Sequence, residues 1–297
     1  MDFLDRLIEL ALDEDLGAAG DVTTRAVVPP GAQGRADLLA KERLVVSGLE
    51  AFVRVFARVD PAVEVRTLAK DGDEAADGAR LAEVSGSLAA MLMAERTALN
   101  LIQRACGIAT LSRQAADAVK GSRVRILDTR KTSPGMRALS KEAVRAGGAS
   151  NHRFGLFDGV LIKDNHIAAV GGSVRQALRL ARQRAPRLVK IEVEVTSIAQ
   201  LKEALEEHPD VVLLDNMTDA QIAEAVAVTH GSVELEVSGG VTLERLGALA
   251  KLGVDYVSMG ALTHSARAMD LSLEILAQGR GSAAPTGKRG SRPPKPR

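Results

Sequence analysis

Short β-branched or aliphatic runs recur through the second half of this 297-residue chain, and a stretch of helical pattern follows each run. Asp215 and Ser238 are 23 residues apart, and Ser238 and Gly260 are 22 apart, which leaves room for one strand, one helix and two short loops. Alternation at this interval predicts parallel strands joined by right-handed crossovers, and hence an α/β fold. The six predicted strands lie at 124–131, 159–165, 190–195, 210–216, 233–240 and 255–261.

Two architectures accommodate these strands. A closed α/β barrel usually needs about seven or eight strands, so one more strand would have to lie in a less patterned region. The alternative is an open, doubly wound sheet. That alternative is weakened because the glycine fingerprint of a dinucleotide-binding unit is missing after the first predicted strand.

The first part of the chain has a different pattern, in which short β-like runs and a helix alternate within 35–70. Residues 1–16 predict an amphipathic helix. Residues 88–120 predict either two helices or one long helix interrupted at Gly107. Together these segments predict a separate N-terminal α/β unit.

Near the other end of the chain, residues 265–278 predict a final amphipathic helix with Ser265 as its N-cap. Residues 279–297 are rich in Gly, Pro, Ser and basic residues and predict a disordered tail. From Arg280 onward there are six basic residues and no acidic ones, so a formal charge of +1 for the whole chain becomes −5 without them. Binding of the tail to nucleic acid or to an acidic surface is a minor alternative.

Composition excludes several classes of protein. Only 2% of the residues are aromatic, which argues against single-stranded nucleic-acid binding because that needs stacking platforms. No apolar stretch is long enough for a membrane span, and the N-terminus lacks the basic region of a signal peptide. Cys106 is the only cysteine, so no intrachain disulfide can form, and it is expected to be a buried structural thiol. We therefore expect a cytoplasmic protein with no nucleic-acid or membrane partner.

Charged residues or glycines stand at the end of each predicted strand or within it. Side chains at the carboxyl ends of barrel strands converge on one mouth, where barrel active sites form. The plain alternative is a set of solvated loops with scattered charges. The strand ends are Asp128-Thr129-Arg130-Lys131, Lys163-Asp164-Asn165, Asp215-Asn216, Ser238-Gly239-Gly240 and Gly260, and the third strand carries Glu192 and Glu194.

The converging residues have a definite chemical character. Four cations and a histidine at one mouth indicate a substrate with several negative charges, because arginine binds carboxylate and phosphate in a bidentate manner. They are Arg130, Lys131, Arg153, Lys163 and His152. Taken singly, each is more often an inert surface cation.

Two acids and a set of glycines accompany the cations. Glu194 and Asp215 lie on neighbouring predicted strands and suit Mg²⁺ or ribose hydroxyls, with general acid–base catalysis as the competing role. Glu192 has the same strand parity as Glu194, so both are expected to face the lumen. Glycine lets backbone N–H groups approach an anion, which predicts a phosphate site at Ser238, Gly239, Gly240 and Gly260.

Arg96, Asn100 and Arg104 are spaced four residues apart and form one polar stripe on the helix predicted over 88–104. The stripe is either a solvated helix face or a means of delivering a cation to an active site, including that of a neighbouring subunit. The spacings of His166, His208 and His230 do not match a zinc site.

Several motifs together resemble those of the quinolinate phosphoribosyltransferases. The resemblance covers nearly the whole chain to about residue 278, and its most specific part is the run from 128 to 167. The motifs are EDLGAAGDVTT at 14–24, ERTALNLIQRACGIAT at 95–110, DTRKTSPGMR at 128–137, GGASNHRFGLFDGVLIKDNHI at 147–167, EVEV at 192–195, LLDNM at 213–217, SGGV at 238–241 and GALTHSA at 260–266.

The resemblance implies an N-terminal α/β sandwich and a C-terminal seven-stranded parallel α/β barrel. The sandwich would cover residues 1–107 and be completed by the helix at 265–278, and the barrel would cover 108–264. It also implies a homo-oligomer, at least a dimer, in which the sandwich of one subunit caps the barrel of another. The implied reaction joins quinolinate to phosphoribosyl pyrophosphate with loss of CO2, giving nicotinate mononucleotide and pyrophosphate.

The resemblance also implies roles for single residues. Lys131, Lys163, Glu194 and Asp215 would be catalytic, with Glu194 and Asp215 binding Mg²⁺ and ribose. Arg96 would reach the partner's site. The residues expected to hold the two quinolinate carboxylates are Arg130, His152, Arg153 and Lys163; those expected to contact the phosphoribosyl group are Lys131, Ser238, Gly239, Gly240 and Gly260. Thr129 is expected to bind substrate.

Two other functions stay open at this point. One is a related phosphoribosyltransferase that acts on nicotinate or another base, although a dicarboxylate needs more cations and this chain supplies them. The other is a phosphate-binding barrel without catalytic activity that regulates a partner. Such a protein would be expected to lack one or more of the strand-end charges, and none is lacking here.

Overall fold

The alternating runs of the second half form a parallel sheet in the computed structural model, which describes residues 2–276. Each of the six strands lies inside its predicted run, and they pair in the order β6-β11-β10-β9-β8-β7. The strands are β6 (Arg125–Leu127), β7 (Val160–Ile162), β8 (Ile191–Val195), β9 (Val211–Asp215), β10 (Glu234–Ser238) and β11 (Tyr256–Ser258).

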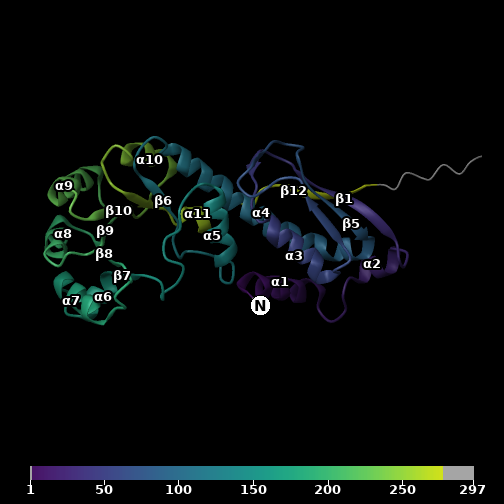
Figure 1. Cartoon of the computed structure of the whole chain (residues 1–297), viewed down its shortest axis with the longest axis horizontal. Helices are drawn as coiled ribbons and strands as arrows, with labels where there is room; N and C mark the ends of the chain where they lie inside the picture. The colour runs from purple at the N-terminus through teal and green to yellow at the C-terminus, as the bar shows by residue number, and fades with distance from the viewer. Residues whose placement is uncertain (1, 277–297) are drawn as a thin grey trace, which may run out of the picture.

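Helices follow these strands and lie on the outer side of their curved row (Figure 1). The hydroxyls of Ser173, Ser197 and Thr218 each accept a backbone N–H three residues on and so begin α7, α8 and α9. The helices are α5 (Arg137–Ala146), α6 (Asp164–Ala169), α7 (Val174–Arg184), α8 (Ile198–Leu205), α9 (Asp219–Thr229), α10 (Leu243–Leu249) and α11 (Ala261–His264).

The strand order excludes the doubly wound alternative. Strands β7 to β11 follow one another in chain order, without the reversal that defines a doubly wound sheet. A single parallel bridge between Leu127 and Ser150 places a seventh segment of chain beside β6. Within residues 2–276 no ladder joins that segment to β7. The parallel α/β sheet is therefore confirmed, and its closure into a seven-stranded barrel stays a prediction.

The N-terminal part is a four-stranded sheet in the order β12-β1-β5-β3 with a small β2-β4 pair, and all its ladders are antiparallel. Helices α3 and α4 pack against the four-stranded sheet. The strands are β1 (Gln33–Ala40), β2 (Leu44–Val45), β3 (Glu64–Thr67), β4 (Glu74–Ala75), β5 (Arg80–Ser87) and β12 (Leu271–Leu276); the helices are α1 (Phe3–Leu16), α2 (Val22–Val27), α3 (Leu49–Val59) and α4 (Leu88–Ala118).

The predicted helix over 265–278 is wrong. Residues Leu271–Leu276 form strand β12, which pairs with β1 in the N-terminal sheet. Leu271 and Leu273 are buried and Ser272 between them is not, which is the period of a strand. The edge of β1 lies more than 200 residues away in the chain, so this long-range pairing overrides the local helical pattern. The predicted tail at 279–297 lies outside the described residues.

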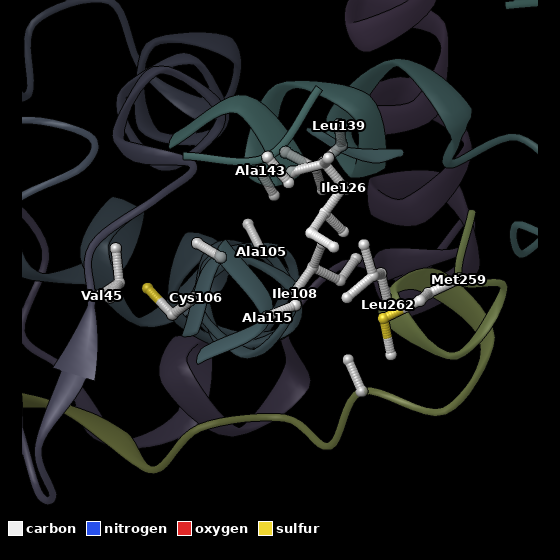
Figure 2. Close-up of a cluster of buried hydrophobic side chains, with 14 of the residues drawn as sticks. Val45, Ala105, Cys106, Ile108, Ala115, Ile126, Leu139, Ala143, Met259 and Leu262 are labelled. Atoms are coloured by element: carbon white, nitrogen blue, oxygen red, sulfur yellow. The ribbon is translucent and has the colours of Figure 1, made fainter. Parts of the chain in front are cut away.

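Helix α4 joins the two parts of the molecule as one continuous helix, with no break at Gly107. A Cβ at Gly107 would lie 1.8 Å from the carbonyl oxygen of Arg267, so the glycine permits close packing and does not interrupt the helix. Figure 2 shows the apolar core around α4, where Ile108 and Ala115 lie near Ile126 and Leu262. The core therefore runs from one part of the molecule into the other.

Cys106 is fully buried on this helix, as predicted, and burial raises the pKa of its thiol to about 12. The thiol therefore stays protonated and acts as a small apolar side chain. None of the helices within residues 2–276 combines the length and the apolar composition that crossing a membrane requires.

Candidate active site

A cavity of about 570 Å³ opens at the carboxyl ends of the parallel strands. Residues from all six strands, or from the loops that follow them, line the cavity. Active sites of α/β barrels form at this end of the strands. Eleven predicted site residues line it: Thr129, Arg130, Lys131, His152, Arg153, Lys163, Glu194, Asp215, Ser238, Gly239 and Gly240. The predicted convergence is therefore confirmed for all these residues.

The cations in the cavity lie close enough to influence one another. Partial burial and the neighbouring Arg130 guanidinium both lower the pKa of Arg153. Neighbouring cations create a positive potential that favours the binding of an anion. Arg153 Nη1 donates to the carbonyl of Gly159 at 2.9 Å, which fixes the orientation of the guanidinium group. The cavity therefore presents oriented positive charge to a ligand.

A buried ion pair supports the loop that carries His152 and Arg153. Lys141 Nζ donates to Asp128 Oδ1 at 2.7 Å and to the carbonyl of His152 at 2.8 Å. Asp128 also accepts from the side chain of Asn151 at 2.9 Å and from the backbone N–H of His152 at 2.8 Å. Sequence reasoning did not assign these supporting roles to Asp128, Lys141 and Asn151, because they depend on a helix and a loop meeting in space.

The two predicted carboxylates face the same cavity from adjacent strands. Glu194 forms an ion pair with Lys163, and Asp215 Oδ2 accepts from the side chain of Asn216 at 2.7 Å. Strand alternation places Glu192 on the same side of β8 as Glu194, as expected, while Val193 and Val195 are buried on the other side. Two carboxylates beside cations form an oxygen-rich set that suits Mg²⁺ shared with a phosphorylated ligand.

Backbone geometry explains the glycines after β10. Gly239 has a φ of 91°, and a Cβ there would lie 2.2 Å from Asn216 Oδ1. Any other residue would displace Asn216 and strain the backbone. Gly240, with a φ of 56°, and Ser238 continue the lining of the cavity. Gly260 does not line this cavity but packs against the Lys131 side chain, since a Cβ there would lie 3.0 Å from Lys131 Cδ.

Arg96 is the one predicted cation that stands apart. It is exposed on α4 and is not among the residues that line the cavity. Asn100 is exposed as well, whereas Arg104 donates to the carbonyls of Thr263 and Ala266 and holds the segment after α11 against α4. Arg104 therefore has a structural role, whereas the side chain of Arg96 is exposed to solvent.

His152 and Glu236 form the floor of the cavity, and Glu192 lies against them without lining it; the sequence pattern had not pointed to Glu236. His152 Nε2 lies 3.0 Å from Glu192 Oε2 and 3.6 Å from Glu236 Oε2. Glu236 could have been found from strand parity, because it lies two residues before Ser238 on β10 and so faces the same side. The cavity also includes four other residues that were not assigned: Leu161, Leu213, Asn216 and Ser258.

A larger hollow of about 670 Å³ lies over the N-terminal sheet, far from these groups. Most of its charged side chains pair with one another, Arg80 with Asp37 and Arg66 with Glu83. Two of its three arginines are neutralised in this way, and the hollow does not lie at the carboxyl ends of parallel strands, where the predicted site residues converge. We therefore assign the candidate active site to the smaller cavity.

The fold and the cavity define an α/β enzyme of the class that binds multiply charged anions at the carboxyl ends of parallel strands. Family models of quinolinate phosphoribosyl transferase match the chain twice, with the N-terminal domain over residues 21–106 and the C-terminal domain over residues 108–274. The chain therefore belongs to the quinolinate phosphoribosyltransferase family.

Individual relatives agree with this assignment. The chain is 42% identical over 273 residues to a probable carboxylating nicotinate-nucleotide pyrophosphorylase of Bacillus subtilis, covering 92% of this chain and 93% of that protein. It is 45% identical to the carboxylating nicotinate-nucleotide pyrophosphorylase of Mycobacterium leprae, covering 90% and 95%. The crystal structure of the Ehrlichia chaffeensis nicotinate-nucleotide pyrophosphorylase superposes with a TM-score of 0.88 at 38% identity, covering 93% and 99%.

Proposed function

We propose that this protein transfers a phosphoribosyl group from phosphoribosyl pyrophosphate to quinolinate, with decarboxylation, and so makes nicotinate mononucleotide, CO2 and pyrophosphate for NAD biosynthesis. The observation that carries the proposal is the convergence of Arg130, Arg153 and Lys163 with Glu194 and Asp215 on one cavity. Family membership points to the same reaction.

The positive charge of the cavity favours a substrate with two carboxylates. Arg130, Arg153 and Lys163 offer more positive charge than one carboxylate can use, and His152 lies beside them, so two carboxylates fit this wall of the cavity. Lys131 and the Ser238-Gly239-Gly240 turn lie on the side that would receive the phosphoribosyl group. The leaving pyrophosphate and the oxocarbenium-like carbon need fixed charges around them, and no covalent nucleophile is required.

Magnesium fits the two carboxylates of the cavity. Glu194 and Asp215 supply oxygen atoms beside a site for a polyphosphate, which is the usual setting for this ion. When bound, Mg²⁺ would neutralise charge on the departing pyrophosphate. The protein's own contribution is to hold Glu194 near Lys163 and Asp215 near Asn216, so that both acids stay directed at the ribose.

A homo-oligomer with shared active sites accounts for the position of Arg96. Its side chain is exposed and lies outside this chain's own cavity, so the proposed contact with quinolinate requires a second copy of the chain. We also propose that the protein is cytoplasmic. Its single cysteine is a free thiol that can form no intrachain disulfide, which fits a reducing compartment.

Purified protein with Mg²⁺ and phosphoribosyl pyrophosphate tests the proposal. We expect quinolinate to be consumed and nicotinate mononucleotide to form, with nicotinate itself a poor substrate because it leaves cations unpaired. Turnover of nicotinate without turnover of quinolinate would assign the protein to the related activity on the monocarboxylate. Binding of both substrates without turnover would favour the regulatory barrel.

A further inference from the structure

Two glutamates and one histidine form a cluster at the base of the cavity, where His152 and Glu236 line it and Glu192 lies behind them. Glu236 is 2% exposed and Glu192 is 7% exposed, and each has one carboxylate oxygen, Oε1, for which the described residues provide no hydrogen-bond partner. One ligand atom from each of His152, Glu192 and Glu236 lies within 4.8 Å of the others. Two ionised carboxylates at this separation would repel each other in a medium of low dielectric constant.

The cluster therefore needs either a metal ion or an extra proton. The backbone N–H of Arg153 donates to His152 Nδ1 at 2.7 Å, so the imidazole's own proton must be on Nε2. Nε2 then donates to Glu192 and has no lone pair for a metal. A second proton on the imidazole would break the bond from Arg153. Glu192 already accepts the bond from Nε2 at 3.0 Å, whereas Glu236 lies farther from Nε2, at 3.6 Å, and is the more deeply buried acid, so we place the extra proton on Glu236.

The surroundings of Glu236 support this assignment. Burial first, and then the nearby Glu192, raise the pKa of Glu236 to about 8, while His152 and Ser258 act in the opposite direction. The groups that face it are Glu192 from β8, Ser258 from β11, and His152 and Arg153 from the loop before β7. Its register partners are Leu213 of β9, which carries no charge, and Tyr256 of β11, whose hydroxyl donates to Glu234 at 3.0 Å.

We propose that Glu236 is a neutral carboxylic acid in the resting protein and determines affinity for the dianionic substrate by removing one negative charge from the floor of the cavity. This inference rests on the proposed function for the identity of the ligand. An ionised Glu236 would oppose the same carboxylates that Arg130 and Arg153 attract, and would do so where solvent screens little.

A second cavity explains how Glu236 exchanges its proton when substrate fills the first. This space of about 270 Å³ lies among the first residues of several strands, including Arg125, Glu234 and Tyr256. His152, Arg153 and Glu236 line both cavities, so they form the wall between them. Water on the far side can therefore reach Glu236 while quinolinate occupies the near side.

The test is the affinity for quinolinate between pH 7 and pH 9, measured by calorimetry without phosphoribosyl pyrophosphate. If only the protonated form binds well, the Kd at pH 9 should be about tenfold that at pH 7, because one proton is lost above a pKa of about 8. In the Glu236→Gln variant the ratio should fall to about one, since the amide keeps the shape of the neutral acid. The Glu234→Gln variant, two residues away on β10 and paired with Lys190, should keep the ratio of the wild type.

A second measurement detects the protonation state of Glu236 directly and does not require a substrate. Infrared spectra should show the C=O band of a protonated carboxylic acid at pH 7 that is absent in Glu236→Gln and is lost from the wild type above pH 9. Absence of that band overturns the proposal, as does an equal pH dependence of the Kd in wild type and variant. A stoichiometric metal ion lost in Glu236→Gln would also overturn it. If quinolinate binds to no form while the band is present, the proposed substrate is wrong and the neutral acid stands.

Discussion

The Nζ of Lys141 lies 2.7 Å from Oδ1 of Asp128, and the two side chains are 4% and 0% exposed. Replacing Lys141 with Met keeps most of its volume but leaves Asp128 as a buried charge without its cation. We expect the free energy of unfolding to fall by about 3–5 kcal/mol, measured by urea denaturation. Activity should fall as well, because the same ammonium group holds the backbone of His152.

The control for this variant is Lys202→Met on α8, where the lysine is exposed. Its free energy of unfolding should change by no more than about 0.5 kcal/mol. A loss of similar size in both variants would mean that the ion pair with Asp128 is not the cause.

Two helical glycines make a matched pair. A Cβ at Gly107 would lie 1.8 Å from the carbonyl oxygen of Arg267, whereas a Cβ at Gly247 in α10 would meet nothing within 4 Å. Gly107→Ala should therefore destabilise the protein by more than about 2 kcal/mol through overpacking. Gly247→Ala should be neutral or stabilise it by up to about 1 kcal/mol, because alanine has the better helix propensity. Melting temperatures of the two variants check this, and similar values would contradict the close approach at Gly107.

Stability should depend on pH through the cluster on the cavity floor. Burial raises the pKa of Glu236 from 4.5 to about 8, so between these values the unfolded chain releases a proton that the folded chain keeps. The contribution of Glu236 to stability is therefore intact below pH 4.5 and is lost as the pH rises to about 8.

The measurement is the urea midpoint of wild type and Glu236→Gln at pH 5.5 and at pH 8. Titratable groups that lie far from Glu236 cancel in the difference. We expect the wild type to lose more stability than the variant between the two pH values. An equal loss would show that Glu236 does not titrate in this interval.

Shared active sites predict complementation between inactive variants. Arg96→Ala and Lys163→Ala should each be inactive alone, and mixing them after reversible dissociation should restore roughly a quarter of the activity of a wild-type dimer. This follows because half of the dimers are mixed and each mixed dimer has one intact site. Mixing Lys131→Ala with Lys163→Ala should restore nothing, since both residues line the cavity of one chain. Recovery in both mixtures, or in neither, would contradict a contribution of Arg96 across subunits.

Much of the site could be predicted because parallel strands place their carboxyl ends at one edge. Arg130, Lys163 and Asp215 are far apart in the chain, but each follows or ends a strand, so strand periodicity alone brought them together. Strand parity likewise placed Glu192 beside Glu194. The same parity applies to Glu236, which lies two residues before Ser238 on β10.

Other features depended on contacts that local patterns do not encode. Strand β12 was mistaken for a helix because its partner, β1, lies at the opposite end of the sequence. Gly107 was interpreted as a helix break, but the carbonyl of Arg267 that requires a glycine there comes from a distant loop. The roles of Lys141 and Asn151 arise only once α5 meets the loop before β7.

The most direct test follows labelled CO2 released from carboxyl-labelled quinolinate in the presence of phosphoribosyl pyrophosphate and Mg²⁺. If the cations of this cavity bind the dicarboxylate, the wild type should release one CO2 for each pyrophosphate. Arg130→Met should reduce that rate by about 10²-fold or more while its melting temperature stays close to that of the wild type. No release of CO2 by the wild type, or undiminished release by Arg130→Met, would contradict the assignment.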